Sequence, residues 1–598
     1  MKLRPLSLSI ATLVLLSACQ TVPSGDATAT DAARAAADTA AAAADAAAAS
    51  ADAAAASDEA YAASELEAVV VAQEGRRSKA APSRPLTQAR AKMAPLPAPA
   101  APPVMYEAFE RLAATPPPAA NTENYEHRTD NPVHRASEQP VSTFSIDVDT
   151  GSYSNARRML RDGVRPPADA VRAEEFLNYF DYGHPAPDSL ATPFRVSTEL
   201  APAPWNNKRQ LLMVGIKGYD VPKAVLPPAN LVFLIDTSGS MAEEDKLPLL
   251  KRSFALLTKQ LRAQDRVSIV VYAGSAGLVL PPTPGDHGGE ILAALEQLDA
   301  GGSTNGGEGI ALAYAMAKQS FVKGGINRVI LATDGDFNVG TVDQNALKTL
   351  VGDQRKSGIA LSTLGFGSGN YNDAMAEQLA DVGDGQHAYI DSLQEANKVL
   401  VQELGSTLMT IARDVKIQIE FNPATVAEYR LIGYENRVLN QEDFANDRVD
   451  AGDIGAGHQV TALYEITPVG SGAERMPALR YAAPATKAAK GNELAHLRLR
   501  YKPEGQQQSR LIETPVLRSQ LRGAPSESLR FASAVAGFAD TLRGGTHMDN
   551  WSWQAMADTA RGSLGKDPNG ERAELVQLIG MARALVEAQP KAAAAISD

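Results

Sequence analysis

The stretch that most constrains the fold of this chain is a run of five apolar residues, 231–235, followed by Asp236, Ser238 and Ser240. Such a run predicts a strand that is buried on both faces, and strands of this kind occur in parallel sheets covered by helices. In open α/β sheets, ligands bind just beyond the carboxyl ends of the strands. Three oxygen-bearing side chains therefore lie where such a sheet builds its site. Oxygen ligands without histidine or cysteine suit a hard cation such as Mg²⁺.

Strands and helices alternate from Asn230 onward. Strands are expected at 231–235, 266–272, 328–333, 359–365 and 387–390. Helices are expected between them at 245–262, 288–298, 307–322, 343–357 and 372–381, with a closing helix at 395–412. This alternation predicts an α/β domain with a doubly wound parallel sheet and right-handed crossovers.

Segments rich in β-formers lie on both sides of this α/β unit. Strands are expected near 143, at 194–200 and 210–219 before it, and at 415–421, 428–434, 459–466, 494–501 and 509–515 after it. Short helices are expected at 154–162 and 170–180, and residues 524–590 are mainly helical in pattern. We interpret the two flanks as one β-sandwich into which the α/β domain is inserted, with helices at the C-terminal end.

The length of 598 residues predicts several domains. The expected boundaries are 1–18 for a signal peptide, 19–140 for a spacer, 141–228 for an N-terminal segment, 229–412 for the α/β domain, 413–520 for a β-rich segment and 521–598 for a helical segment. The net charge of −13 argues against nucleic-acid binding and for an acidic soluble surface.

The N-terminus reads as a targeting segment. Lys2 and Arg4 precede an apolar run, 6–16, that is too short to span a bilayer as a mature helix. The run ends in Leu-Ser-Ala-Cys19, which resembles the lipobox of bacterial lipoproteins. That resemblance implies that Cys19 is lipidated and that, with Gln20 next, the chain is anchored to the outer membrane, facing either the periplasm or the exterior. The alternative is an ordinary signal peptide with an incidental cysteine.

The spacer has two compositional parts. In the first, aspartate recurs every seven residues in nearly pure alanine, at Asp31, Asp38, Asp45 and Asp52. This period suits either an alanine coiled coil or, as we favour, an unpaired spacer. Residues 75–140 are rich in Pro and Ala and include several basic residues, a composition typical of an extended linker. A basic patch touching anionic lipid or cell-wall polymer is the less favoured interpretation.

Two further segments add oxygen atoms on the same side of the predicted sheet. One is the loop 301–308, Gly-Gly-Ser-Thr304-Asn-Gly-Gly-Glu, and the other is Thr-Asp334-Gly at the end of a strand. With Asp236, Ser238 and Ser240 they resemble the metal-ion-dependent adhesion site of von Willebrand factor type A domains over residues 229–412. Residues 144–154 and 173–180 are similar to the N-terminal segment of bacterial von Willebrand A lipoproteins of the YfbK type, so that this likeness runs from about 142 to near the C-terminus.

The resemblance implies a role for each residue. Ser238, Ser240 and Thr304 would bind Mg²⁺ (or Mn²⁺ or Ca²⁺) directly, whereas Asp236 and Asp334 would act mainly through water. An ion held by neutral hydroxyls is poorly compensated and attracts a carboxylate from a protein partner. Ser303 could replace Thr304 in this set. Glu308 is better explained as a first-turn acid that favours the helix dipole than as a sixth ligand.

The function expected from these features is metal-dependent binding of a protein, for adhesion or as a scaffold, rather than catalysis. The sequence contains neither HExxH nor GxSxG. The alternative is a metal-assisted hydrolase acting on cell-envelope material, for which only Glu308, Asp334 and Asp336 are placed as bases. A third possibility is a structural anchor in which the metal only stiffens loops. The motif Asp147-x-Asp149-Thr-Gly-Ser superficially resembles calcium loops, but a helix-capping or inter-domain hydrogen-bonding role is favoured.

Overall fold

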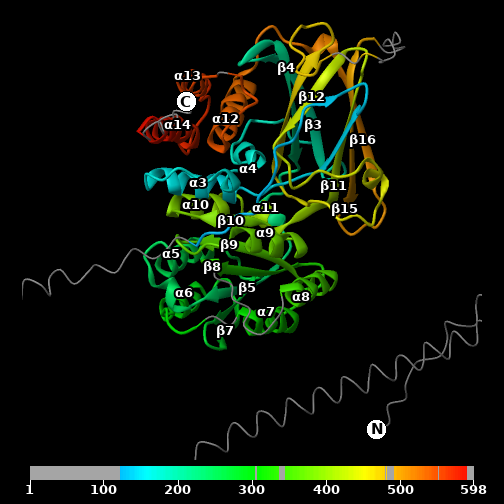
Figure 1. Cartoon of the computed structure of the whole chain (residues 1–598). Coiled ribbons are helices and arrows are strands. Elements are labelled where there is room, and N and C mark those ends of the chain that lie inside the picture. Colours follow the sequence, from blue (N-terminus) through cyan, green and yellow to red (C-terminus); the bar gives the residue numbers. More distant parts are fainter. Residues whose placement is uncertain are drawn as a thin grey trace, which may run out of the picture. The chain divides into compact units, whose positions relative to one another are not determined.

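The computed structural model describes residues 122–303, 306–335, 344–477, 480, 491–549 and 551–588 (Figure 1). The chain divides into two units, 1–107 and 108–598, and every described residue lies in the second. The predicted signal peptide, Cys19 and the spacer as far as residue 121 lie outside the described residues. Within the described ranges, no helix combines the length and the apolar character needed to cross a bilayer.

The α/β domain is built on a six-stranded sheet in the order β10-β9-β8-β5-β6-β7. Its strands are β5 (Ala229–Asp236), β6 (Arg266–Tyr272), β7 (Ala276–Pro284), β8 (Ile326–Thr333), β9 (Ala360–Phe366) and β10 (His387–Ile390). The five predicted strands are parallel to one another, as expected. A sixth strand, β7, was not predicted, and it runs antiparallel to β6 at the edge of the sheet. β7 contains three prolines, which are tolerated on an edge strand but not in a sheet interior.

Helices cover both faces of this sheet (Figure 1). They are α5 (Leu247–Thr258), α6 (Gly288–Glu296), α7 (Gly306–Gln319), α8 (Gln344–Lys356) and α9 (Asp373–Val382). Leu231, Phe233 and Ile235 of β5 pack with α5 and α6, whereas Val232 and Leu234 pack with α7, α8 and α9. The central strand is therefore buried on both faces, as its apolar run predicts.

The predicted closing helix 395–412 is wrong at its C-terminal end. The segment forms α10 (Leu393–Asn397), a π-helical turn η4 (Lys398–Gln402) and α11 (Leu404–Leu408), after which β11 begins at Thr410. Ile411 and Ala412 are buried in the core of the sandwich, and Ala412 pairs with Pro503. Burial in that core outweighs the local helical pattern.

The sandwich is assembled from both flanks of the α/β domain. One sheet has the order β1-β12-β14-β4-β3, and the other has the order β13-β11-β15-β16, with β2 also paired to β11. The strands are β1 (His134–Arg135), β2 (Val141–Ser145), β3 (Phe194–Ala203), β4 (Asn206–Gly218), β11 (Thr410–Phe421), β12 (Val426–Ile432), β13 (Ile454–Gly455), β14 (Gln459–Pro468), β15 (Glu493–Pro503) and β16 (Arg510–Leu517). Because β4 pairs with β14, the predicted insertion of the α/β domain into a sandwich is confirmed.

A helical layer joins the N-terminal segment to the C-terminal end. Its helices are α3 (Gly151–Arg161), α4 (Ala173–Asn178), α12 (Glu527–Arg543), α13 (Trp553–Arg561) and α14 (Glu571–Ala588). Phe176 and Phe180 pack with Phe531 and Phe538 in one core, which also takes Leu211 from β4. Short 3-10 turns complete the described elements: η1 (Ala168–Ala170), η2 (Lys223–Val225), η3 (Gly239–Ala242), η5 (Gln441–Ala445) and η6 (Arg518–Gln520).

Candidate metal centre

The two predicted serine ligands lie side by side at the carboxyl end of β5. The strand ends at Asp236, and the turn η3 follows immediately. The Oδ1 atom of Asp236 accepts a hydrogen bond from the Ser238 amide at 2.9 Å, which closes the turn. The Oγ atoms of Ser238 and Ser240 then lie 3.0 Å apart. The local backbone therefore directs both hydroxyls to one place.

Asp236 is fully buried behind these serines. Its second oxygen, Oδ2, accepts hydrogen bonds from the Tyr272 hydroxyl at 3.1 Å and from Thr333 Oγ1 at 3.3 Å. Burial raises the pKa of Asp236 to about 6, the Asp334 charge adds to this, and the bond from the Ser238 amide opposes it. Negative charge is thus crowded at this sheet edge, where a cation would relieve it.

Asp334 follows β8 and is also fully buried. Its Oδ2 atom lies 3.2 Å from the ammonium of Lys246 and accepts a hydrogen bond from Asn370 Nδ2 at 3.0 Å. The Lys246 ammonium also donates to Asn370 Oδ1 at 3.0 Å, so the three side chains form a closed network. Lys246 is only 3% exposed, which makes it part of the site rather than of the solvated surface.

Lys246 and Asn370 are not among the site residues that the sequence predicts. Asn370 follows the carboxyl end of β9, so the rule that identified Asp236 and Asp334 could have identified it as well. Lys246 offers a weaker signal, because a lysine just before a helix is ordinarily solvated. Only the tertiary structure shows that it turns inward.

The hydroxyl pair fits a hard divalent cation of the size of Mg²⁺. In near-octahedral coordination with bonds of about 2.0–2.1 Å, adjacent ligands lie about 2.9 Å apart. Ser238 Oγ and Ser240 Oγ are hydrogen-bonded to each other at 3.0 Å, and this separation is compatible with two adjacent ligands of one such ion. Asp236 and Asp334, next to this pair, supply the carboxylates that would hold water molecules of the ion. The oxygen atoms of the described site residues therefore suit the hard cation that the sequence predicts.

The third predicted ligand, Thr304, lies outside the described residues, as does Asp336, so the choice between Thr304 and Ser303 stays a prediction. The start of their loop is nevertheless held at the site. The amide of Gly239 donates to Gly302 O at 3.1 Å, and the amide of Gly301 donates to Thr237 O at 2.8 Å. Glu308 is exposed in the first turn of α7, the position expected of an acid that favours the helix dipole.

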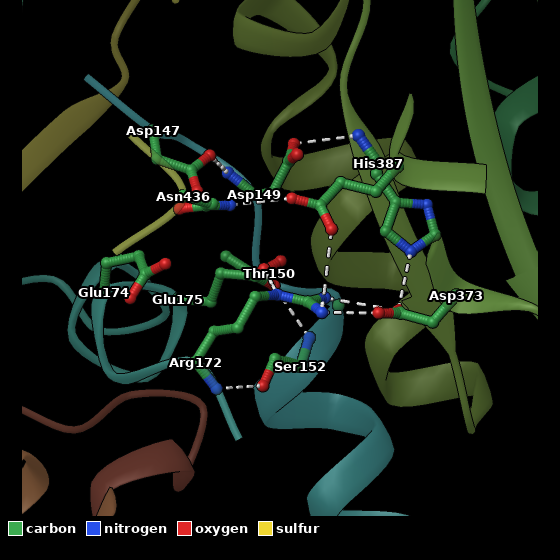
Figure 2. Close-up of polar contacts among 12 residues, drawn as sticks. Asp147, Asp149, Thr150, Ser152, Arg172, Glu174, Glu175, Asp373, His387 and Asn436 are labelled. Carbon is green, nitrogen blue, oxygen red and sulfur yellow. Dashed lines mark hydrogen bonds and ion pairs between the residues drawn. The ribbon is translucent and has the colours of Figure 1, made fainter. Parts of the chain in front are cut away.

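The Asp-x-Asp-Thr-Gly-Ser motif lies in a different place, in a buried polar cluster between the N-terminal segment and the α/β domain (Figure 2). Asp149 accepts a hydrogen bond from the His387 amide of β10 at 2.8 Å. Arg172 forms ion pairs with Glu175 and Asp373 in the same cluster. The favoured inter-domain hydrogen-bonding role of this motif is therefore confirmed.

Known protein families match the chain in three places. The family described as "von Willebrand factor type A domain" matches residues 231–336, "von Willebrand factor" matches 119–213, and "Uncharacterized protein YfbK, C-terminal" matches 406–585. The uncharacterized protein YfbK of Escherichia coli K12 is 51% identical over 471 residues, which cover 77% of this chain and 81% of that protein.

More distant similarities cover smaller shares of this chain. The magnesium-chelatase 60 kDa subunit of Rhodobacter capsulatus is 29% identical over 152 residues, covering 25% of this chain and 27% of that protein. A solved structure described as von Willebrand factor type A from Catenulispora acidiphila aligns with a TM-score of 0.37 at 15% identity, covering 67% of this chain and 91% of that one.

Proposed function

Because the chain belongs to the YfbK family of proteins with a von Willebrand factor type A domain, we propose that it is a membrane-anchored module that captures an acidic residue of a protein partner through a divalent ion. Ser238, Ser240 and Thr304 would hold the ion, and Asp236 and Asp334 would hold its water molecules. The observation that supports this most strongly is the 3.0 Å separation of the serine hydroxyls beside two buried carboxylates.

The charge of the site supports the capture of an acid. Asp236 and Asp334 contribute two negative charges, and Lys246 contributes one positive charge within 3.2 Å of Asp334. A divalent ion would bring the net charge to +1. A buried excess of positive charge with an open coordination position favours a carboxylate from outside.

The same geometry favours binding over hydrolysis. A hydrolase would need a base near the metal, and the candidates were Glu308, Asp334 and Asp336. Glu308 is exposed on α7, and Asp334 is ion-paired with Lys246. Asp336 lies outside the described residues. The described geometry therefore offers more to a ligand carboxylate than to a water nucleophile.

The proposed location is the outer membrane, with Cys19 as the lipidated residue. The support is the sequence alone: an apolar run of eleven residues, 6–16, with Cys19 close behind it. Mass spectrometry of the mature N-terminus tests this proposal. We expect an acylated Cys19, and an unmodified N-terminus at another residue would contradict it.

Cross-linking in intact cells, followed by capture of the cross-linked partner with purified protein, tests the binding function. We expect that EDTA abolishes the capture, that excess Mg²⁺ restores it, and that Asp236→Ala prevents it while the sandwich stays folded. The matched control is Asp353→Asn, which changes the same charge on the exposed surface of α8. Capture that is unchanged by EDTA would contradict the proposal.

A further inference from the structure

A second polar site lies away from the metal centre. A cavity of about 240 Å³ opens where three parts of the chain meet: the segment 145–149, the end of α9 with residues 381–385, and the sandwich loops 436–439 and 450–453. Its charged lining is almost wholly acidic, consisting of Asp147, Asp149, Asp381, Asp384, Asp450, Asp453 and a single arginine, Arg437.

The arginines around the cavity compensate these charges only in part. Arg437 lies 3.4 Å from Asp147, 3.8 Å from Asp149 and 2.9 Å from Asp381. It also lies 3.8 Å from Glu377, so one guanidinium is shared by four carboxylates. Two arginines approach from outside the lining. Arg355 pairs with Asp384 at 3.0 Å and with Asp450 at 2.5 Å, and Arg413 pairs with Asp384 at 3.4 Å. The six carboxyl groups of the lining therefore outnumber the three arginines that pair with them.

Asp453 is the least compensated member. Its Oδ1 atom accepts a hydrogen bond from the Asp414 amide at 3.2 Å. In the described part of the chain it has no ion pair within 4.0 Å. Burial raises its pKa well above the ordinary value, the charge of Asp384 adds to this, and Arg413 opposes the rise only from farther away. Burial likewise raises the pKa of Asp149, with a contribution from Asp147.

Among the described residues of this lining, two buried carboxylate oxygens accept no hydrogen bond. They are the Oδ2 atoms of Asp147 and Asp453. Asp147 is 3% exposed, and its other oxygen already accepts from the Asp149 amide at 3.1 Å. A buried acceptor without a donor costs about 1–3 kcal/mol, and more when it is charged. These two oxygens are therefore positions at which a ligand with N–H donors would be stabilised.

The positions of the acidic side chains favour an organic cation over a metal ion. No three Asp, Glu, His or Cys side chains of the described residues are placed to hold one metal ion. The acids are instead distributed around the wall, which suits a ligand with several separated N–H donors. The volume lies just below the ~300–1,000 Å³ range of drug-sized ligands, so a small molecule or a single side chain fits.

We propose that this cavity binds a small organic cation with primary amino groups, which donate to Asp147 and Asp453. Asp147 belongs to the segment that leads into α3, Asp384 follows α9, and Asp453 precedes β13. A bound amine would thus link the N-terminal segment, the α/β domain and the sandwich. The ligand is either a free diamine or a lysine side chain of a partner, since both present the same ammonium group.

Calorimetric titration of the full chain in EDTA, with 1,5-diaminopentane and with Nα-acetyl-lysine amide as separate probes, tests this proposal. We expect that one of them binds and raises the melting temperature, and that Asp453→Asn and Asp147→Asn each weaken that binding at least tenfold. The probe that binds more tightly identifies the source of the amine. Asp353→Asn, with the same charge change on the exposed surface of α8, is expected to bind as the wild type does.

Three results would overturn the proposal: binding that is equal in wild type and in both cavity variants, binding of neither amine, or calcium binding that is lost in Asp453→Asn while amines do not bind. The double variant Ser238→Ala/Ser240→Ala is expected to keep amine binding. Failure of the amine site is therefore distinguishable from failure of the metal centre.

Discussion

The ammonium of Lys246 lies 3.2 Å from the Oδ2 atom of Asp334, and both groups are buried at the carboxyl edge of the α/β sheet. The site thus contains a cation of its own next to the hydroxyls that would hold a metal. This positive charge opposes a divalent ion but favours an anionic ligand of that ion. The Lys246 charge is therefore expected to lower the affinity for the metal ion and to raise the affinity of the loaded site for an acidic ligand.

Lys246→Met is expected to strengthen Mg²⁺ binding about tenfold, which corresponds to ~1.4 kcal/mol. The same variant is expected to weaken capture of the acidic partner, because the loaded site falls from a net charge of +1 to zero. Titration calorimetry with Mg²⁺ and partner capture measure the two effects separately. Lys246→Arg, which keeps the charge, is the control. Weaker Mg²⁺ binding by Lys246→Met would contradict this interpretation.

Thr304→Val is expected to reduce Mg²⁺-dependent partner capture at least tenfold, since it removes the predicted third hydroxyl ligand and keeps the shape of the side chain. Ser303→Ala is expected to retain capture. The comparison distinguishes the two neighbouring candidates in the loop that hydrogen bonds of Gly239 and Gly301 hold at the site. The reverse result would assign the role to Ser303.

Arg157→Met is expected to destabilise the protein by about 3–5 kcal/mol, because it leaves buried carboxylates without their cation. Arg157 is 2% exposed and pairs with Asp391 at 2.5 Å, with Glu395 at 2.7 Å and with Glu574 of α14 at 3.2 Å. Urea unfolding measures the loss. Arg583→Met removes an exposed pair on α14 and is expected to change stability by less than about 1 kcal/mol.

The stability of the protein is expected to fall between pH 4.5 and pH 8 through Glu174. Burial raises the pKa of this carboxyl from 4.5 to about 8, with contributions from Glu435 and Asp147. The stabilisation that neutral Glu174 provides is complete below pH 4.5, its value in the unfolded chain, and is lost as the pH rises through 8.

The variant Glu174→Gln isolates the contribution of Glu174 to the pH dependence of stability from that of other titrating residues. Glutamine keeps an acceptor for the Tyr434 amide, which donates to Glu174 Oε2 at 2.9 Å, and it does not ionise. The variant is expected to match the wild type at pH 5 and to melt at a higher temperature at pH 8.5. Glu587→Gln, exposed on α14, serves as the control. Equal melting temperatures of Glu174→Gln and wild type at pH 8.5 would contradict the expected burial of charge.

Much of the fold could be predicted because its strongest signals are local. The apolar run before Asp236 and the strand–helix alternation after it are consequences of burial on both faces of a parallel sheet. The end of the closing helix could not be predicted from the local pattern. Ile411 and Ala412 are buried in the core of the sandwich, which is formed by residues distant in sequence. β7 was not predicted because its local sequence argues against a strand: its prolines are tolerated in a sheet only at an edge.

The candidate site was predictable where residues follow the ends of strands, as Asp236 and Asp334 do. Lys246 and Tyr272 contact those two carboxylates from other elements, and no local pattern reports such contacts. The acidic cavity was even harder to predict from the sequence. Asp147, Asp384 and Asp453 are far apart in the sequence, and only the meeting of three parts of the chain brings them to one wall.

Titration of Mg²⁺ into wild type and into Ser238→Ala/Ser240→Ala, with Ser519→Ala as an exposed serine control, tests the central claim most directly. We expect one ion per chain in the wild type and in Ser519→Ala, and at least a hundredfold weaker binding in the double variant with an unchanged melting temperature in EDTA. Mg²⁺ binding by the double variant at wild-type affinity would show that the two hydroxyls do not hold the ion.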